Sequence, residues 1–269
     1  MQKLPVFSII TVTFNAEKVL ENTLLSVINQ TYTHIEYIII DGGSLDGTVN
    51  LIRQYESCLH CWISEPDKGI YDAMNKGLRE ATGDYVWFLN AGDTLQHYNI
   101  IMELAMKVES AELSDILYGE TDLMDSDGRV FAERRLKTPR NLTWTSFRMG
   151  MLVCHQAFIV KRSIAVNYDL QYWFSADFDW CIRCLKKAEE IGKEARILNP
   201  LLGKTGNIVN TRLRLVNYLY EGVTTANRKA SLKERYAIMC KYYGTFATTL
   251  LHGWFAIRYY WAKLFKNNC

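Results

Sequence analysis

Two aspartates each follow a run of apolar residues, in the positions where a buried strand would end. Asp41 directly follows IEYIII (35–40), and Asp93 follows YVWFLNAG (85–92). Continuous apolar runs of this kind are typical of strands that are buried on both faces of a parallel sheet. A carboxylate combined with a diphosphate is a common way to hold Mg²⁺ or Mn²⁺. The sequence therefore predicts a site for a phosphate-bearing ligand, unless each acid only stabilises a turn.

Strands and helices alternate through the first third of the chain. Four apolar and β-branched segments are predicted to be strands: 6–14, 35–40, 61–64 and 84–89. Helical spacing or helix-start signals mark three segments between them: 16–30, 46–55 and 70–81. This alternation predicts an α/β fold with a mostly parallel sheet and helices on both faces.

The loops after these strands exclude two common nucleotide-binding motifs. They read TFNA, DGGS, EPDKG and NAGD. The first contains no glycine, whereas a dinucleotide fold needs G-x-G-x-x-G there, and the chain has no G-x-x-x-x-G-K-[ST]. Ligands of open α/β sheets bind outside the carboxyl ends of the strands, so we expect these polar loops to form a different kind of site.

Several ordered segments resemble a known enzyme family. They read FSIITVTFNAEKVLENTLLSVINQTY, IIIDGGSLDGT, SEPDKGIYDAMNKGLREATGDYVWFLNAGDTL and SADFDWCIR. Together they span about residues 6–190 and are similar to family 2 glycosyltransferases with a GT-A fold, including bacterial enzymes of capsule, exopolysaccharide, O-antigen and colanic-acid-type assembly. The resemblance implies an inverting transferase that moves a sugar from a UDP-, GDP- or dTDP-sugar to a glycan or lipid-linked acceptor.

The resemblance implies a donor site at the strand ends. Its expected residues are Thr13, Phe14, Asn15, Asp41, Lys68, Asn75 and Asn90. Phe14 would stack on the nucleobase, and Asp41 would accept hydrogen bonds from the base or ribose. Asp41 could instead serve only its glycine-rich turn. Residues 67–75 would line the diphosphate, with Lys68 either a phosphate contact or a solvated surface lysine.

The NAGD segment occupies the place of the family's metal-binding D-x-D. The first acid of that motif is replaced, and only Asp93 remains. The resemblance implies that Asp93 binds Mn²⁺ or Mg²⁺ together with phosphate oxygens and water. The small residues Ala91 and Gly92 would let the diphosphate approach the backbone.

A second carboxylate comes from SADFDWCIR. The family's E-D motif reads Ala176-Asp177 here, so the usual Glu is missing. The resemblance implies that Asp177 is the base that removes the proton of the acceptor hydroxyl. Asp179 competes for this role, and either residue could instead be a helix N-cap. A base opposite a leaving diphosphate would invert the anomeric centre.

Three residues are candidates for the acceptor pocket. The resemblance implies an acceptor or phosphate contact for His155 and Gln156, which precede a predicted strand. A histidine before a strand is also often structural. Trp173, upstream of Asp177, could stack on an acceptor sugar or belong to the core.

Cysteine usage favours a reducing, cytoplasmic setting. The chain has seven cysteines, no export signal at its start and no uninterrupted apolar run of the ~18 residues that a membrane span needs. Cys58-x-x-Cys61 and Cys181-x-x-Cys184 have metal-like spacing. The second pair also fits one buried face of a helix, and we favour that interpretation.

The last 59 residues differ in charge from the rest. Residues 211–269 contain ten Lys and Arg against Glu221 and Glu234, a net charge of +8 in a chain of net charge +2. We therefore divide the chain into a GT-A domain, 1–210, and a basic, aromatic-rich helical extension, 211–269.

An apolar stripe runs along the end of this extension. Its members recur at helical spacing: Phe246, Leu250, Trp254, Ile257, Trp261 and Leu264. The stripe would pack on the catalytic domain or, as an interfacial helix, dock on the anionic inner face of the plasma membrane. We expect no nucleic-acid partner.

Two other functions remain open. A nucleotidyltransferase would make a sugar nucleotide, but it usually has a G-x-G-[ST]-R-x-x-P loop where this chain has TFNAEKV. A non-catalytic relative would only bind a sugar nucleotide, which the presence of both Asp93 and Asp177 disfavours.

Overall fold

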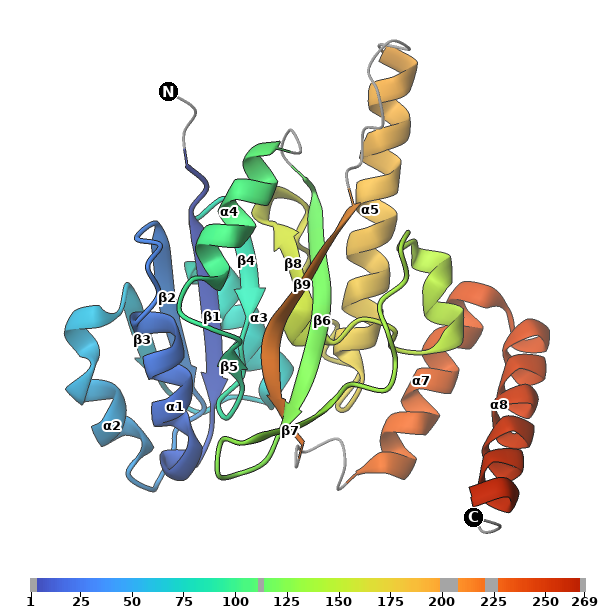
Figure 1. The fold of residues 1–269 in the computed structure, drawn as a ribbon, viewed down its shortest axis with the longest axis horizontal. Coiled ribbons are helices and arrows are strands. Elements are labelled where there is room, and N and C mark those ends of the chain that lie inside the picture. The colour runs from blue at the N-terminus through green and yellow to red at the C-terminus, as the bar shows by residue number, and fades with distance from the viewer. Residues whose placement is uncertain (1–3, 111–113, 199–207, 221–226, 267–269) are drawn as a thin grey trace.

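The computed structural model describes residues 4–110, 114–198, 208–220 and 227–266, with a β-sheet at the centre and helices around it (Figure 1). The strands are β1 (Phe7–Thr13), β2 (Ile35–Asp41), β3 (Cys61–Ser64), β4 (Tyr85–Phe88), β5 (Thr94–Leu95), β6 (Ile116–Met124), β7 (Val130–Glu133), β8 (Phe158–Lys161) and β9 (Ile208–Leu219). The α-helices are α1 (Glu17–Ile28), α2 (Thr48–Gln54), α3 (Ile70–Glu80), α4 (Ile100–Ser110), α5 (Ala176–Leu198), α7 (Arg228–Tyr243) and α8 (Thr245–Lys266).

The four predicted strands form the parallel half of the sheet. They lie in the order β3-β2-β1-β4, and every neighbouring pair is parallel. Thr13 at the end of β1 therefore lies beside Asp41 at the end of β2. The carboxyl ends of these strands meet at one edge, as the alternation of strands and helices predicts.

Beyond β4 the sheet is mixed rather than mostly parallel. The order continues β8-β6-β9-β5, with β7 beside β6, and only the β6–β9 pair is parallel among these described strands. The short connection between β6 and β7 allows only an antiparallel pair, because a parallel pair needs a long crossover. The predicted α/β fold class is confirmed. The prediction of a mostly parallel sheet is wrong for this half, where most pairs are antiparallel.

Each face of the sheet carries its own core, since side chains alternate along a strand. Phe7 and Ile9 of β1 point to the face covered by α1, α2 and α4, while Ile10 and Val12 point to the face covered by α3 and α5. Cys181 and Cys184 are fully buried in α5 within the second core. The helix-face interpretation of this cysteine pair is confirmed.

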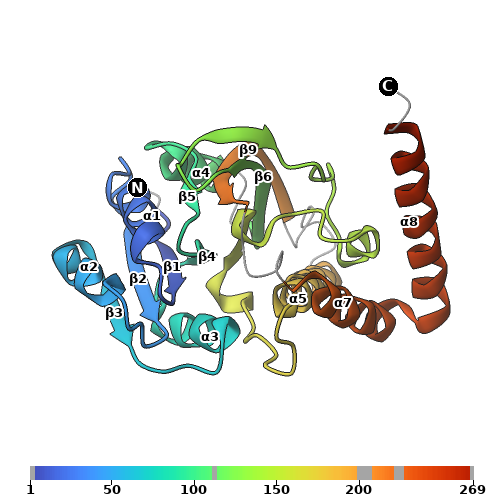
Figure 2. The ribbon, with the colours of Figure 1, turned by 90° about the horizontal axis from the view of Figure 1, so that it is seen from below.

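The basic extension begins with a strand and continues as two helices. The expected boundary at residue 210 falls inside β9, which pairs with β5 and β6 and so belongs to the central sheet. In the described part of the extension, α7 and α8 are the elements that do not belong to the sheet. Helix α7 lies beside α5, and α8 lies at the periphery of the molecule (Figure 2). A domain division therefore remains a proposal, and it is better placed after β9.

The outer face of α8 is apolar and exposed. The exposed fractions are 79% for Phe246, 60% for Leu250, 56% for Trp254 and 54% for Ile257. The side chains of Trp261 and Leu264 lie outside the described part of the helix. No described helix is both long and apolar enough to cross a membrane.

Candidate active site

The loops after β1 and β2 hold each other in place. The Asn15 backbone N–H donates to Oγ of Ser44 over 2.7 Å, and the Leu45 N–H donates to Oδ1 of Asn15 over 2.9 Å. Asn15 adopts a left-handed conformation with φ of +48°. Its side-chain oxygen therefore braces two loops of the expected donor site.

Asp41 is fully buried and organises the DGGS turn. Its Oδ2 accepts hydrogen bonds from the N–H groups of Gly43 (3.1 Å) and Ser44 (2.9 Å) and from Oγ of Ser64 (2.7 Å). Its Oδ1 accepts one from Oγ of Ser44. The turn interpretation of Asp41 is therefore confirmed, and its contact with a base or ribose stays a prediction.

Phe14 presents an exposed ring at the edge of the sheet. The side chain is 61% exposed. A Cβ built on Gly42 would lie 2.4 Å from Oδ2 of Asp67 and 3.4 Å from the Phe14 ring, so a glycine is required where the three loops meet. An open aromatic face here is suited to stack on a planar base.

Lys76 fixes the loop after β3, a role that the sequence analysis missed. Its Nζ lies 2.8 Å from Oε1 of Glu65 and donates to the carbonyl oxygen of Pro66 over 3.0 Å. The residue is 8% exposed, although the loop that it holds carries the exposed Lys68. A lysine on the apolar face of the predicted helix was the available signal.

Asn75, which the sequence analysis assigned to the donor site, makes its hydrogen bonds within the protein. Its Nδ2 donates to the carbonyl oxygen of Tyr168 over 3.0 Å, and its Oδ1 accepts from the Tyr168 N–H over 2.7 Å. The residue is 6% exposed. Because both ends of the amide are engaged, Asn75 joins α3 to the segment that precedes α5.

Thr13, the last residue of β1, and Asn90, two residues after the adjacent strand β4, carry unpaired polar atoms. Oγ1 of Thr13 and Oδ1 of Asn90 are buried and make no hydrogen bond within the described structure. An unpaired buried polar atom costs free energy, and a bound partner removes that cost. Both predicted donor residues therefore keep atoms available for a polar ligand.

Asp93 lies behind these atoms, with only 3% of its surface exposed. Its Oδ1 accepts a hydrogen bond from the Leu219 N–H over 2.8 Å. Burial raises the pKa of Asp93 to about 7, against smaller opposing effects of hydrogen bonds from Leu219 and Gln156. A nearby cation would favour the ionised form.

A cation at Asp93 would obtain few ligands from the protein. The described residues contain no group of three or more His, Cys, Asp or Glu side chains that could hold a metal ion. Asp93 would be the carboxylate ligand, and phosphate oxygens and water would complete the coordination, which Mg²⁺ accepts. The donor set thus fits a cation that arrives with a diphosphate.

The space beside Gly92 is occupied by a side chain of the protein itself. A Cβ at this position would lie 2.6 Å from Cδ2 of Leu219, and Gly92 has a φ of +99°. The end of β9 therefore covers the NAGD turn. The turn thus needs Gly92 whatever ligand binds, and the approach of a diphosphate to the backbone here stays a prediction.

Asp177 and Asp179 have different surroundings in the first turn of α5. Oδ1 of Asp177 accepts hydrogen bonds from the Tyr71 hydroxyl (3.2 Å) and from the Phe178 N–H (2.8 Å). Asp179 is fully buried, and its carboxylate is bound by the residues Arg183, Lys241 and Tyr242. The ion pairs and hydrogen bonds of Asp179 hold α7 against α5, whereas Asp177 remains partly exposed.

The charges of both candidate carboxylates affect the pKa of Tyr218, near the end of β9. Burial raises the pKa of its hydroxyl first, and the charges of Asp93 and Asp177 raise that pKa further. Asp93 and Asp177 therefore both lie close enough to Tyr218 for their charges to affect it, although they are far apart in sequence. The sequence analysis did not identify Tyr218, because nothing in YLY distinguishes it from a core tyrosine.

His155 belongs to the core, which corrects its assignment to the acceptor pocket. It is 4% exposed, its Nε2 lies 2.6 Å from the Tyr168 hydroxyl, and its ring contacts Phe88 and Trp180. Burial lowers the pKa of His155 to about 4. The structural alternative for this histidine is therefore confirmed.

Gln156 also lies elsewhere than expected. It is 6% exposed, and its Oε1 accepts a hydrogen bond from the Cys154 thiol over 3.0 Å. Its side chain also lowers the pKa of Asp93. Gln156 thus supports the candidate metal ligand rather than an acceptor.

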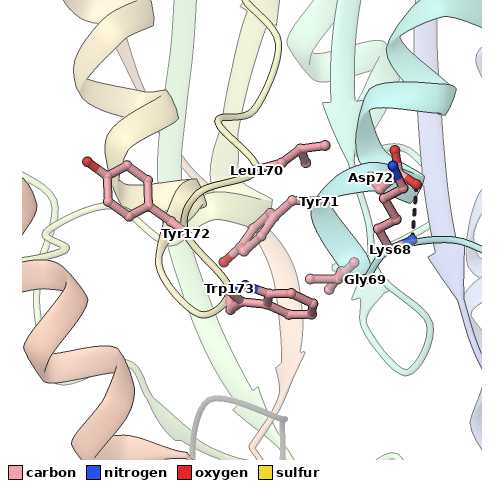
Figure 3. Close-up of a pocket in the computed structure, with 8 residues that line it drawn as sticks. Lys68, Gly69, Tyr71, Asp72, Leu170, Tyr172 and Trp173 are labelled. Atoms are coloured by element: carbon pink, nitrogen blue, oxygen red, sulfur yellow. Dashed lines mark hydrogen bonds between the residues drawn. The ribbon is translucent and has the colours of Figure 1, made fainter.

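A cleft lies between the start of α3 and the segment before α5 (Figure 3). Trp173 is 63% exposed, and its ring lies 3.7 Å from the position of a Cβ on Gly69. The backbone N–H groups of Trp173 and Phe174 donate to the carboxylate of Glu234 in α7. The extension therefore positions the loop that carries Trp173 and leads into Asp177.

Comparison with known proteins places this geometry in a family context. A sequence profile described as glycosyl transferase family 2 matches residues 8–158. The "PGL/p-HBAD biosynthesis glycosyltransferase" of Mycobacterium tuberculosis is 31% identical over 216 residues, which are 77% of this chain and 80% of that protein.

Two solved structures share the fold at low sequence identity. S. aureus TarS, residues 1–349, in complex with UDP-GlcNAc has a TM-score of 0.63 and 17% identity, covering 87% of this chain and 64% of that one. The mannosyltransferase PcManGT from Pyrobaculum calidifontis, in complex with GDP-Man and Mn²⁺, has a TM-score of 0.60 and 15% identity, covering 93% and 71%. The chain thus spans less than two thirds of this form of TarS.

Proposed function

Because this chain belongs to glycosyl transferase family 2, we propose that it transfers a hexose from a nucleotide-diphosphate-sugar to an acceptor hydroxyl with inversion. The acceptor in this proposal is a glycan or a lipid-linked precursor of a cell-surface polysaccharide. The TarS and PcManGT structures hold UDP-GlcNAc and GDP-Man, which supports a nucleotide-sugar donor for this chain. The nucleotides to test are UDP, GDP and dTDP.

The observation that carries this proposal is the placement of two unlike carboxylates around one region. Asp93 is buried beside the unpaired atoms at the strand ends, while Asp177 is partly exposed and bonded to the Tyr71 hydroxyl. A transferase needs one group toward the leaving diphosphate and another toward the attacking hydroxyl. The charges of Asp93 and Asp177 both raise the pKa of the Tyr218 hydroxyl, which supports a placement of the two carboxylates around one region.

In the proposed reaction Asp177 takes the proton of the acceptor hydroxyl as the hydroxyl oxygen attacks the anomeric carbon. The Tyr71 hydroxyl orients the carboxylate by its hydrogen bond. Phe14 stacks on the base, and Thr13 and Asn90 offer polar atoms to the donor. Asp93 would hold Mn²⁺ or Mg²⁺, which neutralises charge on the departing diphosphate.

The extension supports a proposed place of action at the cytoplasmic face of the plasma membrane. The stripe of α8 exposes Phe246, Leu250, Trp254 and Ile257, and the last 59 residues carry a net charge of +8. Aromatic and aliphatic side chains enter the headgroup region, while basic residues are attracted to anionic lipid. Docking there would hold the enzyme beside a lipid-linked acceptor.

Incubation with UDP-, GDP- and dTDP-sugars, with and without Mn²⁺, tests the proposed activity. We expect release of one nucleoside diphosphate that depends on an added membrane extract as a source of acceptor. Release of pyrophosphate would indicate a nucleotidyltransferase instead. Tight binding of a sugar nucleotide without turnover under any of these conditions would indicate a non-catalytic relative.

A further inference from the structure

Helix α7 is bonded to the segment that leads into Asp177. Oγ of Ser231 lies 3.0 Å from Oγ of Ser175, and the Glu234 carboxylate accepts the backbone N–H groups of Trp173 and Phe174. Figure 2 shows α7 alongside α5. Ser231 and Glu234 lie three residues apart and therefore on one face of α7. The residue after Glu234 is Arg235.

Arg235 places a cation over the ring of the residue that follows the candidate base. Its guanidinium carbon lies 5.8 Å from the centre of the Phe178 ring, and Phe178 follows Asp177 in the chain. The charge of Arg235 also lowers the pKa of the Tyr71 hydroxyl, against larger opposing effects of burial and of Asp177. Arg235 thus lies over the residue that follows Asp177 and close enough to Tyr71 for its charge to act on the Tyr71 hydroxyl.

The guanidinium of Arg235 has an unused donor. Its Nε is buried and has no hydrogen-bond partner among the described residues. By contrast, Lys241 on the same helix is paired with Asp179 over 3.5 Å. A buried donor left without a partner is unfavourable, and a bound anion relieves that cost.

We propose that Arg235 binds a phosphate group of a substrate in the active site, so that α7 supplies a binding residue as well as support. This inference rests on the proposed transferase function. Arginine suits the role because its planar fork can donate two hydrogen bonds to one phosphate. Two substrates carry such a group: the nucleotide-sugar donor and a lipid diphosphate acceptor.

Two substitutions separate this role from a packing role over Phe178. Arg235→Met keeps an unbranched side chain over the ring but removes the charge and every donor. Arg235→Lys keeps the charge but loses the planar fork. Lys233→Ala, at an exposed position two residues earlier in α7, is the matched control for the loss of one positive charge.

Calorimetric titrations with five probes identify the phosphate that Arg235 binds: UDP, GDP, dTDP, farnesyl diphosphate and farnesol. We expect Arg235→Met to weaken binding of the diphosphate-bearing substrate by about 10- to 100-fold, the scale of a hydrogen bond to a charged group. Arg235→Lys should recover part of that loss, and Lys233→Ala should bind as the wild type does. A loss confined to a nucleoside diphosphate indicates the donor, and a loss confined to farnesyl diphosphate, with farnesol unaffected, indicates the acceptor.

The inference is overturned if Arg235→Met binds every probe as the wild type does. It is also overturned if Arg235→Met and Arg235→Lys lower the melting temperature equally and change no affinity, since that result describes packing alone. These binding measurements need no turnover. A failure of the wild type to release a nucleoside diphosphate from any donor sugar would therefore count against the proposed function and leave the Arg235 result readable.

Discussion

The Tyr71 hydroxyl donates a hydrogen bond to Oδ1 of Asp177, with 3.2 Å between the two oxygens. Burial, together with the charge of Asp177, raises the pKa of Tyr71 well above its usual range, so the hydroxyl stays protonated at any pH at which the protein would work. One carboxylate oxygen is therefore held by a permanent donor. The geometry leaves the rest of the carboxylate to accept a proton.

We expect Asp177→Asn to reduce sugar transfer by ~100-fold or more, the usual scale of a general base, while the affinity for the nucleoside diphosphate stays unchanged. Steady-state rates and calorimetric titration check the two halves of this prediction. Asp179→Asn is the matched control, since Asp179 lies two residues away and is fully buried among Arg183, Lys241 and Tyr242. It should lower the melting temperature. If Asp179→Asn abolishes transfer at an unchanged melting temperature, the assignment is off by two residues.

Metal-dependent stabilisation is expected to weaken as the pH falls below about 7. The pKa of Asp93 is raised to about 7 by burial, so protons compete with a cation for this carboxylate in that range. Thermal-shift measurements with the cognate nucleoside diphosphate and Mn²⁺ at pH 8 and pH 6 test this. Asp93→Ala should abolish transfer and the metal-dependent shift at both pH values. An equal Mn²⁺ shift at pH 8 and pH 6 in the wild type would contradict the proposed ligand.

Asp93 should also destabilise the metal-free protein at high pH. Its pKa in the folded state, about 7, lies above the unfolded value of 3.8. The folded state then holds the proton more tightly, so the stability contribution of Asp93 is fully present below the unfolded value and is lost as the pH rises through about 7. We expect Asp93→Asn to unfold at a higher urea concentration than the wild type at pH 8, with the difference vanishing near pH 4. If Asp93→Asn is less stable than the wild type at pH 8, burial does not determine the pKa of the Asp93 carboxyl.

His155 should change the stability of the folded protein with pH in the direction opposite to Asp93. Its pKa is about 4 in the folded protein and 6.5 unfolded, so its stability contribution is present above the unfolded value and is lost as the pH falls through the folded one. The full loss amounts to about 3 kcal/mol. Because Asp93 offsets this trend, urea unfolding of Asp93→Asn between pH 7 and pH 4 should reveal it. Adding His155→Gln should flatten the profile, and an unchanged slope would contradict the assignment.

The parallel half of the fold could be predicted because a strand buried on both faces is a continuous apolar run. Ile35–Asp41 and Tyr85–Phe88 show this pattern, and the predicted bounds differ from the observed ones by one residue at most at each end. β9 could not be predicted in this way. Its polar residues, such as Asn210, Arg214 and Asn217, interrupt any apolar run, and its place between β5 and β6 depends on contacts far away in sequence.

The sequence could predict which residues lie near the candidate site, but not which hydrogen bonds their side chains make. A motif indicates that Asn75 and His155 lie near the strand ends. It does not indicate that Tyr168 already engages both ends of the Asn75 amide and Nε2 of His155. Tyr71 and Gln156 lie within the motifs or beside them, and their roles appear only once α5 and Asp93 are placed. Hydrogen-bond partners depend on packing between distant segments, which spacing along one segment does not contain.

The stripe of α8 is expected to bind anionic membranes. Thr248 and His252 face α7, where Thr248 is fully buried and His252 contacts Met239 and Tyr236. The opposite face exposes Leu250 and Trp254, so the alternative in which the stripe packs on the catalytic domain is wrong for the described residues. This exposure makes the stripe available to a bilayer without rearrangement of the core.

Co-sedimentation with liposomes that contain phosphatidylglycerol should retain the protein at low salt. Binding should weaken as the ionic strength rises, because salt screens the attraction between the basic tail and the lipid. The double substitution Leu250→Glu and Trp254→Glu should abolish binding and leave nucleoside diphosphate affinity intact, as should removal of residues 246–269. Met106→Glu, at a residue of α4 that is 63% exposed, is the control for a charge placed on an apolar surface side chain elsewhere. Membrane docking of the stripe is contradicted if the double variant still sediments with the liposomes or if the wild type does not bind them.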